Sequence, residues 1–253
     1  MGKIYAIVSG KGGTGKTTTT INLGAALTEF KHDVVIVDAN LTTPNLSLYL
    51  GAPVVPISLA HVLQRKANIE DAIYEHHSGM KVVPSSLSLK DLKKINYGLL
   101  ADSLKSLRKL SNHVLLDSAA GLGDEALAPI SASDEVILVV NPNILSVTDA
   151  LKTIKIAQDM HKRVKGVIIT RVCYENHEMS VKSIQEMLEI PILGIIPEDR
   201  SVHRSLAKRS SVIHSYPRSK ASRAYVDIAA KFIGRKRKKS FYEKFLRNLG
   251  IKI

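Results

Sequence analysis

Short apolar runs alternate along the chain with longer segments in which apolar residues recur at helical spacing. A run of four to seven apolar residues suits a strand that is buried on both faces, whereas spacing of three or four residues suits a helix with one buried side. This alternation predicts an α/β fold with a mainly parallel sheet and helices on both faces. Strands are expected at 4–8, 34–38, 80–84, 113–117, 135–140, 164–170 and 192–197, and helices at 18–30, 58–71 (one or two short ones), 97–110 and 146–161.

Between the first strand and the first helix the chain reads S-G-K-G-G-T-G-K-T-T, which matches the phosphate-loop pattern G-x-x-x-x-G-K-[ST]. A polyphosphate needs inward-pointing backbone N–H groups and the positive end of a helix, and glycine lets the main chain approach closely. Lys16 is expected to reach the β- and γ-phosphates, Thr17 to ligate Mg²⁺ and Thr18 to lie near the α-phosphate. The expected nucleotide-binding residues of this loop are Gly10, Lys11, Gly12, Gly13, Thr14, Gly15, Lys16, Thr17 and Thr18.

Two carboxylates follow apolar runs at the predicted strand ends. Asp38 closes the run 34–37 and Asp117 closes the run 113–116. Open α/β sheets place ligands at the carboxyl ends of their strands, and an acid there commonly holds the Mg²⁺ of a bound nucleotide. Asp117 could instead be an ordinary turn or capping acid. We expect Thr17, Asp38 and Asp117 to form the metal site.

Composition narrows the class of protein to which the chain can belong. At 253 residues with 45% hydrophobic residues, the chain is long enough for one α/β domain of ordinary size. Its single cysteine, Cys173, excludes an intrachain disulfide and paired-cysteine metal or cluster sites. We find no apolar run of about eighteen residues and no signal peptide before the phosphate loop, so a cytoplasmic protein is expected.

The extra lysine in K-G-G-T-G-K-T-T, Lys11, makes the loop resemble that of the deviant Walker A ATPases of the MinD and ParA family. In that family the extra lysine reaches the nucleotide of a partner subunit, so the resemblance implies a homodimer with ATP between two chains. Lys11 could also be a solvated loop lysine. The resemblance, closest to archaeal MinD-like proteins, runs from about residue 2 to 233 and implies ATP or ADP with Mg²⁺ as ligands.

The same resemblance assigns further residues. Thr170 and Arg171 occupy the place of the adenine contacts, and the turn around Pro197 and Asp199 resembles the base-binding turn. The family's Asp-x-Asp stretch has Asp38 in its first position, but Asn40 stands where the second aspartate positions the attacking water. The expected catalytic residues are Lys11, Lys16, Asp38 and Asn40.

The Asn40 position predicts slow ATP hydrolysis, because an amide can hold a water molecule but cannot accept its proton. Alternatively, Asn45 or a partner protein orients the water. A nucleotide-bound scaffold with little turnover also remains open.

The last 23 residues carry nine basic residues against one acid, Glu243, which gives +8 of the total net charge of +13. After R-K-R-K-K, a helix beginning at Phe241 would gather one apolar face and place charged residues opposite, with Ser240 and Glu243 as a capping box. We divide the chain into an ATPase domain, 1–233, and a basic amphipathic membrane-targeting tail, 234–253. The expected membrane-facing residues are Phe241, Tyr242, Phe245, Leu246 and Leu249.

These features predict a MinD-like ATPase that dimerises on Mg-ATP and binds an anionic membrane surface reversibly, at the inner face of the cell membrane. Such a protein would act as a positional switch for the division site or other machinery, with a protein cargo or activator that the sequence does not name. Two alternatives for the tail are a helix packed on its own domain and a basic nucleic-acid arm. The main rival function is that of a ParA-like partition ATPase that binds nonspecific DNA.

Overall fold

The computed structural model describes residues 1–51, 54–88, 90–92 and 95–235. The predicted tail helix, with Phe241, Tyr242, Phe245, Leu246 and Leu249, lies outside the described residues. Within them, eight strands form one sheet in the order β3-β4-β2-β5-β1-β6-β7-β8. All neighbouring strands are parallel except β3 and β4, which are antiparallel. The predicted α/β fold with a mainly parallel sheet is confirmed.

The strands lie close to the predicted runs. Their bounds are β1 Lys3–Val8, β2 Val34–Asp38, β3 Tyr74–Glu75, β4 Lys81–Val83, β5 His113–Asp117, β6 Glu135–Val140, β7 Arg163–Val172 and β8 Ile192–Pro197. Strands β2, β5, β6 and β8 match the prediction residue for residue, because each consists largely of apolar residues. The two-residue strand β3 was not predicted, since it has too few residues to show a period.

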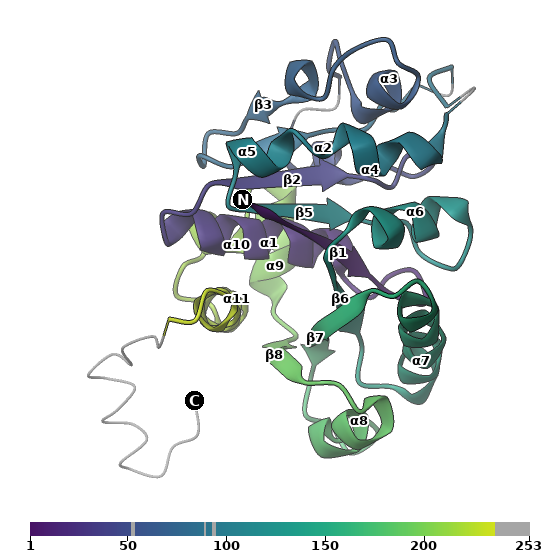
Figure 1. The fold of residues 1–253 in the computed structure, drawn as a ribbon. Helices are drawn as coiled ribbons and strands as arrows, with labels where there is room; N and C mark the ends of the chain where they lie inside the picture. The colour runs from purple at the N-terminus through teal and green to yellow at the C-terminus, as the bar shows by residue number, and fades with distance from the viewer. Residues whose placement is uncertain (52–53, 89, 93–94, 236–253) are drawn as a thin grey trace.

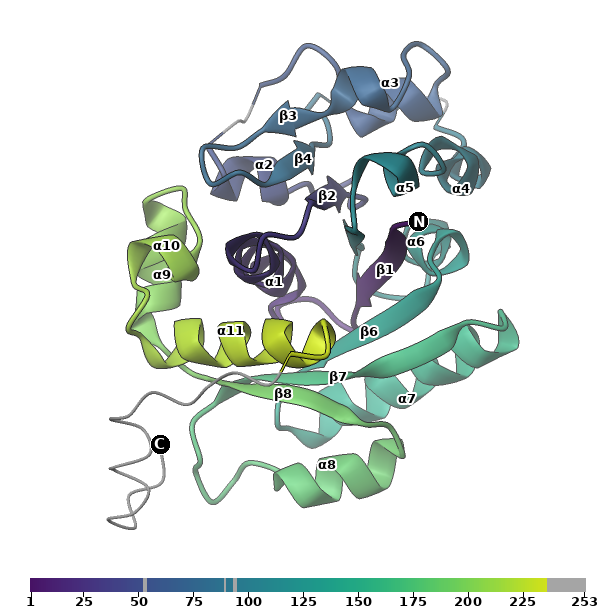
Figure 2. The same cartoon turned by 60° about the vertical axis from the view of Figure 1, so that its left-hand side comes forward.

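Helices cover both faces of the sheet (Figures 1 and 2). One face is covered by α1 Lys16–Glu29, α10 Val212–Ser215 and α11 Lys220–Phe232, with α9 Arg200–Ala207 at its border. The other is covered by α3 Leu59–Leu63, α4 Leu100–Ser103, α5 Leu107–Leu110, α6 Asp124–Ala132, α7 Ile144–Asp159 and α8 Val181–Leu188. The remaining short elements are α2 Leu46–Tyr49, η1 Glu70–Ala72 and η2 Tyr97–Leu99.

The helix predicted over 97–110 is wrong in its continuity, because the structure divides that segment into η2, α4 and α5. Gly98 lies in its first turn, where glycine lowers helix propensity. The breaks keep Leu100, Leu104 and Leu107 all in the core beneath the sheet. Their spacing of four and three residues would also place them on one face of a regular helix, so their burial does not by itself explain the breaks.

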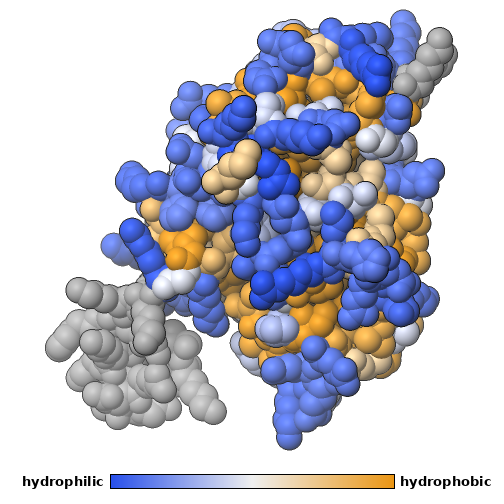
Figure 3. All heavy atoms as spheres, in the orientation of Figure 1, coloured by the Kyte–Doolittle hydropathy of each residue, from blue (hydrophilic) through white to orange (hydrophobic). Residues whose placement is uncertain are grey.

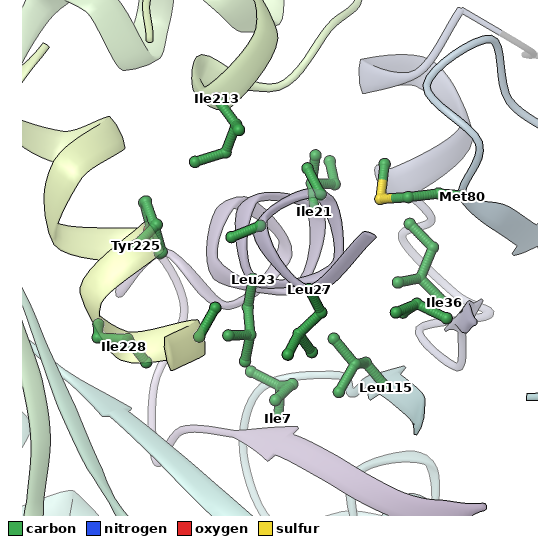
Figure 4. Packing of buried hydrophobic residues seen from close by; sticks show 14 of the residues in the cluster. Ile7, Ile21, Leu23, Leu27, Ile36, Met80, Leu115, Ile213, Tyr225 and Ile228 are labelled. Carbon is green, nitrogen blue, oxygen red and sulfur yellow. The ribbon is translucent and has the colours of Figure 1, made fainter. Parts of the chain in front are cut away.

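Helix α1 lies at the centre of the larger core (Figure 4). Ile7 and Leu115 of the sheet lie on one side of it, and Tyr225 and Ile228 of α11 lie on another. Its residues 19–27 are buried without exception, so the helix has no exposed stripe in this stretch. This packing fixes the N-terminus of α1 at the carboxyl edge of the sheet.

The visible exterior is mostly hydrophilic, with smaller hydrophobic areas between the polar side chains (Figure 3). Among the helices of the described residues, none has the length and apolar character needed to cross a bilayer.

Candidate nucleotide site

The loop between β1 and α1 has the backbone geometry that its glycines permit. Gly13 and Gly15 adopt left-handed conformations, with φ of 77° and 95°. A Cβ on Gly10 would lie 2.5 to 2.6 Å from atoms of Asp149 in α7, so only glycine allows the loop to pack against that helix. The glycines therefore set both the curvature of the loop and its contact with α7.

Lys16 begins α1 and its ammonium group is held beneath the loop. Its Nζ donates a hydrogen bond to Ser9 Oγ at 2.9 Å, and the Ser9 hydroxyl donates to the Lys11 carbonyl at 2.6 Å. Burial lowers the pKa of Lys16, and the nearby Asp117 carboxylate partly opposes that change. The role of Ser9 was missed from the sequence, because a serine before a phosphate loop carries no signal of its own.

Thr17 and Asp117 meet directly. The Thr17 hydroxyl donates to Asp117 Oδ2 at 2.6 Å, and the Thr20 hydroxyl lies 3.4 Å from Asp117 Oδ1. Asp38 and Asp117 are register partners on the adjacent strands β2 and β5, and both are fully buried. The structure thus brings together all three residues of the predicted metal site.

Burial dominates the electrostatics of the two carboxylates. Desolvation raises the pKa of Asp117 to about 6, although hydrogen bonds from Thr17 and Thr20 and the charge of Lys16 act against it. Desolvation also raises the pKa of Asp38 well above its usual range, and the neighbouring Asp117 raises it further. Two buried acids beside one ammonium therefore favour an additional cation.

The loop and its surroundings fit a phosphate group with Mg²⁺. A Cβ on Gly12 or Gly13 would have no described atom within 4 Å, so the loop backbone borders open space. Thr14 Oγ1 is buried and has no hydrogen-bond partner among the described residues, which leaves a polar atom available at the loop. The hydroxyl of Thr17 and the carboxylates of Asp38 and Asp117 are the oxygen ligands that Mg²⁺ prefers.

Asn40 is held by its own loop. Its amide nitrogen donates to the Thr43 carbonyl at 2.7 Å, and its amide oxygen accepts from the Thr43 hydroxyl at 3.0 Å. Asn45, the alternative water-orienting residue, donates to the same carbonyl at 3.0 Å. The hydrogen bonds to the Thr43 carbonyl each use one N–H of an amide that has two, so either side chain could hold a water molecule while it remains on Thr43.

The loop that contains Asn40 is also tied to α6. The backbone N–H of Thr42 donates to Glu125 at 2.7 Å, and its hydroxyl donates to the other Glu125 oxygen. This pair joins the loop after Asp38 to the helix that follows Asp117. Sequence reasoning missed it because the two residues are 83 positions apart and neither belongs to a motif.

The predicted adenine contacts lie at the carboxyl ends of β7 and β8. Arg171 has a left-handed φ of 58° and its Nε lies 3.9 Å from Glu198, while Pro197 ends β8. Both oxygens of Asp199 already accept backbone N–H groups, from Ser201 at 2.8 Å and Ala221 at 3.1 Å. Asp199 therefore caps α9 and also holds the first turn of α11, and a contact to a base through its carboxylate stays a prediction.

Two residues at this edge brace the phosphate loop from β7 and the end of β6. Thr170 donates its hydroxyl hydrogen to the Thr14 carbonyl at 2.6 Å. Asn141 donates to Thr170 Oγ1 at 3.0 Å. The ends of β6 and β7 are thereby fixed to the phosphate loop, which places the segment with Arg171 beside it.

Comparison with known proteins agrees with this geometry. A family model described as the CobQ/CobB/MinD/ParA nucleotide binding domain matches residues 5–212. An uncharacterized ATP-binding protein of Methanocaldococcus jannaschii is 41% identical over 96% of this chain and 95% of its own length. The septum site-determining protein MinD of Neisseria meningitidis is 30% identical over 96% of this chain and 95% of its own length.

Solved structures show the same relationship. The septum site-determining protein MinD of Pyrococcus horikoshii, complexed with Mg-ADP, superposes with a TM-score of 0.88 at 34% identity, covering 92% of this chain and 96% of that one. The resemblance inferred from Lys11 and the phosphate loop is therefore confirmed, as is a P-loop ATPase fold of the MinD and ParA type. The chain belongs to the CobQ/CobB/MinD/ParA nucleotide-binding family.

Proposed function

We propose that the chain is a MinD-like ATPase that dimerises on Mg-ATP and binds anionic membranes reversibly as a positional switch. The observation that carries the nucleotide part is the meeting of Lys16, Thr17, Asp38 and Asp117 at one sheet edge. Bound Mg²⁺ would neutralise phosphate charge there, held by Thr17, Asp38 and Asp117.

The protein's own residues perform the remaining steps. Lys16 binds the phosphates of the nucleotide held by its own chain, and its position under the loop keeps the ammonium group out of bulk water. Lys11 contacts the nucleotide bound to the partner subunit, as the extra lysine does in the family that this chain resembles. The Thr42 to Glu125 contact joins the loop after Asp38 to helix α6, so a change at this loop is transmitted to the helix that follows Asp117.

The tail supplies the membrane part of the proposal. Its predicted apolar face and its basic residues match an anionic bilayer, because the apolar side chains would enter the headgroup region while the cations meet lipid phosphates. The ATP-bound dimer presents two tails on one body. We place the protein in the cytoplasm and at the inner face of the cell membrane, where it recruits a cargo or activating protein.

Vesicle sedimentation tests this proposal. Full-length protein and a variant truncated after Gly234 are mixed with vesicles of phosphatidylcholine and phosphatidylglycerol, with Mg-ATP or Mg-ADP. We expect the full chain to sediment with ATP and much less with ADP, and the truncated variant to stay in the supernatant. Equal sedimentation of both variants would contradict the membrane role of the tail. ATP-dependent, salt-sensitive binding of the truncated variant to DNA would instead favour a ParA-like function.

A further inference from the structure

The place where the tail leaves the body is built from packed aromatic rings. Phe232, the last residue of α11, lies 4.6 Å from the Tyr5 ring and 5.5 Å from the His113 ring, measured between centroids. Tyr5 belongs to β1 and His113 begins β5. The chain is therefore fixed to the amino edge of the sheet only three residues before Arg235, after which the basic tail follows.

Cations gather around this point. Glu135 is buried at the start of β6, and three basic side chains reach its carboxylate: Lys3 at 4.0 Å, Arg163 at 3.2 Å and Lys165 at 3.3 Å. Lys3 and Arg163 remain 57% and 77% exposed, whereas the carboxylate is 6% exposed.

Two further cation contacts lie at the end of α11, one to Phe232 and one from Arg235 to Phe30, which follows α1. Lys165 Nζ lies 4.7 Å from the centre of the Phe232 ring, and Arg235 lies 6.0 Å from that of Phe30. We call Lys3, Arg163, Lys165 and Arg235 the root face.

The root face carries excess positive charge. Three of its four cations contact the one carboxylate, Glu135, and together with Arg235 they leave a local charge of +3. The neighbouring acid Asp134 is already held by both guanidinium nitrogens of Arg108, at 2.6 and 2.8 Å. Exposed Asp33 lies close in sequence to exposed Lys31, so this pair adds no net charge. The buried carboxylate thus orders the cations without neutralising them.

The root face and the nucleotide site lie at opposite edges of the sheet. Strand β1 begins with Lys3 and ends with Val8, directly before the phosphate loop. At about 3.3 Å per residue, its six residues separate the two edges by roughly 16 to 20 Å. Figure 1 shows the chain leaving α11 on the side where β2 and β5 begin.

The length of chain beyond the root limits how far the body can stand from a bound tail. Five residues separate Arg235 from Phe241, where the predicted apolar face begins. Fully extended, that segment spans about 20 Å at most. A tail lying in a bilayer therefore keeps the root face within reach of the lipid phosphates, and opposite charges attract once they approach to about one Debye length, roughly 8 to 10 Å at physiological salt.

We propose that the root face docks on anionic lipid headgroups when the tail is membrane-bound, so that the nucleotide edge of the sheet points away from the bilayer. This proposal rests on the proposed membrane function and adds to it a second contact and a fixed orientation. The tail supplies insertion, while the root face supplies electrostatic attraction from the folded body.

Neutralising the two exposed cations tests the contact. Lys3→Gln/Arg163→Gln removes two charges and leaves Lys165 with Glu135. Lys105→Gln/Lys182→Gln removes two charges that are at least as exposed, from the turn after α4 and from α8, where they pair with Asp102 and Glu186 and not with Glu135. Each basic residue at an anionic surface changes partitioning about fivefold, so we expect at least a tenfold loss for the first variant with phosphatidylglycerol vesicles and Mg-ATP.

The control variant should bind within about twofold of wild type, and both variants should unfold cooperatively and hydrolyse ATP at the wild-type rate. Equal vesicle binding by the two variants, while wild type binds and the truncated chain does not, would overturn the root face but leave the tail function intact. Failure of wild type to bind would overturn both. Loss of DNA binding with unchanged vesicle binding would make the root face a nucleic-acid surface and would also overturn the proposal.

The orientation has its own readout. Cys173, the single cysteine, follows the last residue of β7 at the nucleotide edge and is exposed. Exposed Asn112 precedes β5 at the root edge. A fluorophore on Cys173 should be little affected by lipid-borne quenchers, whereas the same fluorophore on Asn112→Cys/Cys173→Ser should be strongly quenched. Equal quenching at the two sites would contradict the proposed orientation.

Discussion

The nucleotide site depends at the residue scale on charges that the fold brings close together. Asp38 and Asp117 lie side by side in the interior, and Lys16 is the cation that reaches toward them. Burial raises the pKa of both carboxylates because their charged forms lose hydration. A divalent cation would stabilise the ionised forms, which gives a physical reason for the oxygen ligands at this edge.

Motif spacing predicted Lys16, Thr17 and Asp117, because a phosphate loop and a strand-end acid leave strong local signals. Motif spacing could not predict which other side chains these residues and their loops contact. Ser9 beneath Lys16 and Thr42 on Glu125 depend on how distant segments pack, and neither residue type is unusual at its position. Asn40 was noticed as a departure, but its attachment to Thr43 is visible only in the folded loop.

Replacing Asn40 tests the slow-hydrolysis hypothesis. Asn40→Asp restores a group that can accept a proton, and loss of such a group typically costs about 10²- to 10⁴-fold in rate. We expect single-turnover ATP hydrolysis at least about tenfold faster than wild type, with little change in ATP affinity, because Lys16, Thr17 and Asp117 are untouched. Asn45→Asp is the matched control. An unchanged rate in Asn40→Asp would show that this position does not control the chemistry.

At the element scale, the core around α1 determines where the site lies. Strand positions could be predicted because buried parallel strands are continuous apolar runs. The division of segment 97–110 could not be predicted, since the spacing of Leu100, Leu104 and Leu107 is compatible with one continuous helix. The helices after β7 leave weaker sequence patterns, because several are short or largely exposed.

Truncating a core residue of α1 measures how much this packing contributes. Leu23 is fully buried between the sheet and α11 (Figure 4). Leu23→Ala should lower the free energy of unfolding by about 3 kcal/mol, from lost burial and the cavity that remains. Leu145→Ala, at a leucine that is 68% exposed, should change it by less than about 0.5 kcal/mol. Chemical denaturation of the nucleotide-free protein compares the two, and equal effects would contradict the assigned core.

Histidine burial at the start of β5 predicts an acid-sensitive element. Burial, helped by the charges of the neighbouring His32 and Lys165, lowers the pKa of His113 to about 4. In the unfolded chain the histidine binds a proton as pH falls below about 6.5, whereas in the folded protein it stays neutral down to about pH 4. The free energy of unfolding is therefore highest above about pH 6.5 and decreases as pH falls toward about 4.

Because His113 is only half-buried, we expect its contribution to be about 1 kcal/mol between pH 7 and pH 5. His113→Gln should reduce the loss of unfolding free energy over that interval by this amount, measured by urea denaturation at both values of pH. An identical pH dependence in wild type and variant would exclude His113 as the source.

At the scale of the whole molecule, the proposed switch couples two opposite edges of one sheet. Nucleotide binds at the carboxyl edge, while the tail leaves from the amino edge beside Tyr5 and Phe232. A single tail is expected to bind weakly, since ordering it offsets part of its gain. Two tails on one dimer can raise avidity by roughly a hundredfold or more through effective concentration. The sequence predicted the phosphate loop and the tail, but not that they lie at opposite edges of the sheet.

A charge on the apolar face of the tail tests this avidity. Phe245→Glu should abolish ATP-dependent vesicle binding, because the carboxylate cannot enter the headgroup region and is repelled by anionic lipid. Lys244→Glu, on the opposite side of the predicted helix, is the control and should weaken binding only moderately. Normal ATP-dependent dimerisation of Phe245→Glu confirms that the body is intact. Vesicle binding equal to wild type would indicate a purely electrostatic arm.

The most direct test of the whole account is the association state of the protein with Mg-ATP, measured by analytical ultracentrifugation for wild type, Lys16→Ala and Lys11→Ala. Lys16 binds the phosphates of the nucleotide held by its own chain, so Lys16→Ala should lose nucleotide affinity and stay monomeric. Lys11→Ala should bind ATP with near wild-type affinity and still stay monomeric, whereas wild type dimerises with ATP and not with ADP. Normal ATP-dependent dimerisation of Lys11→Ala would contradict the account at its central residue.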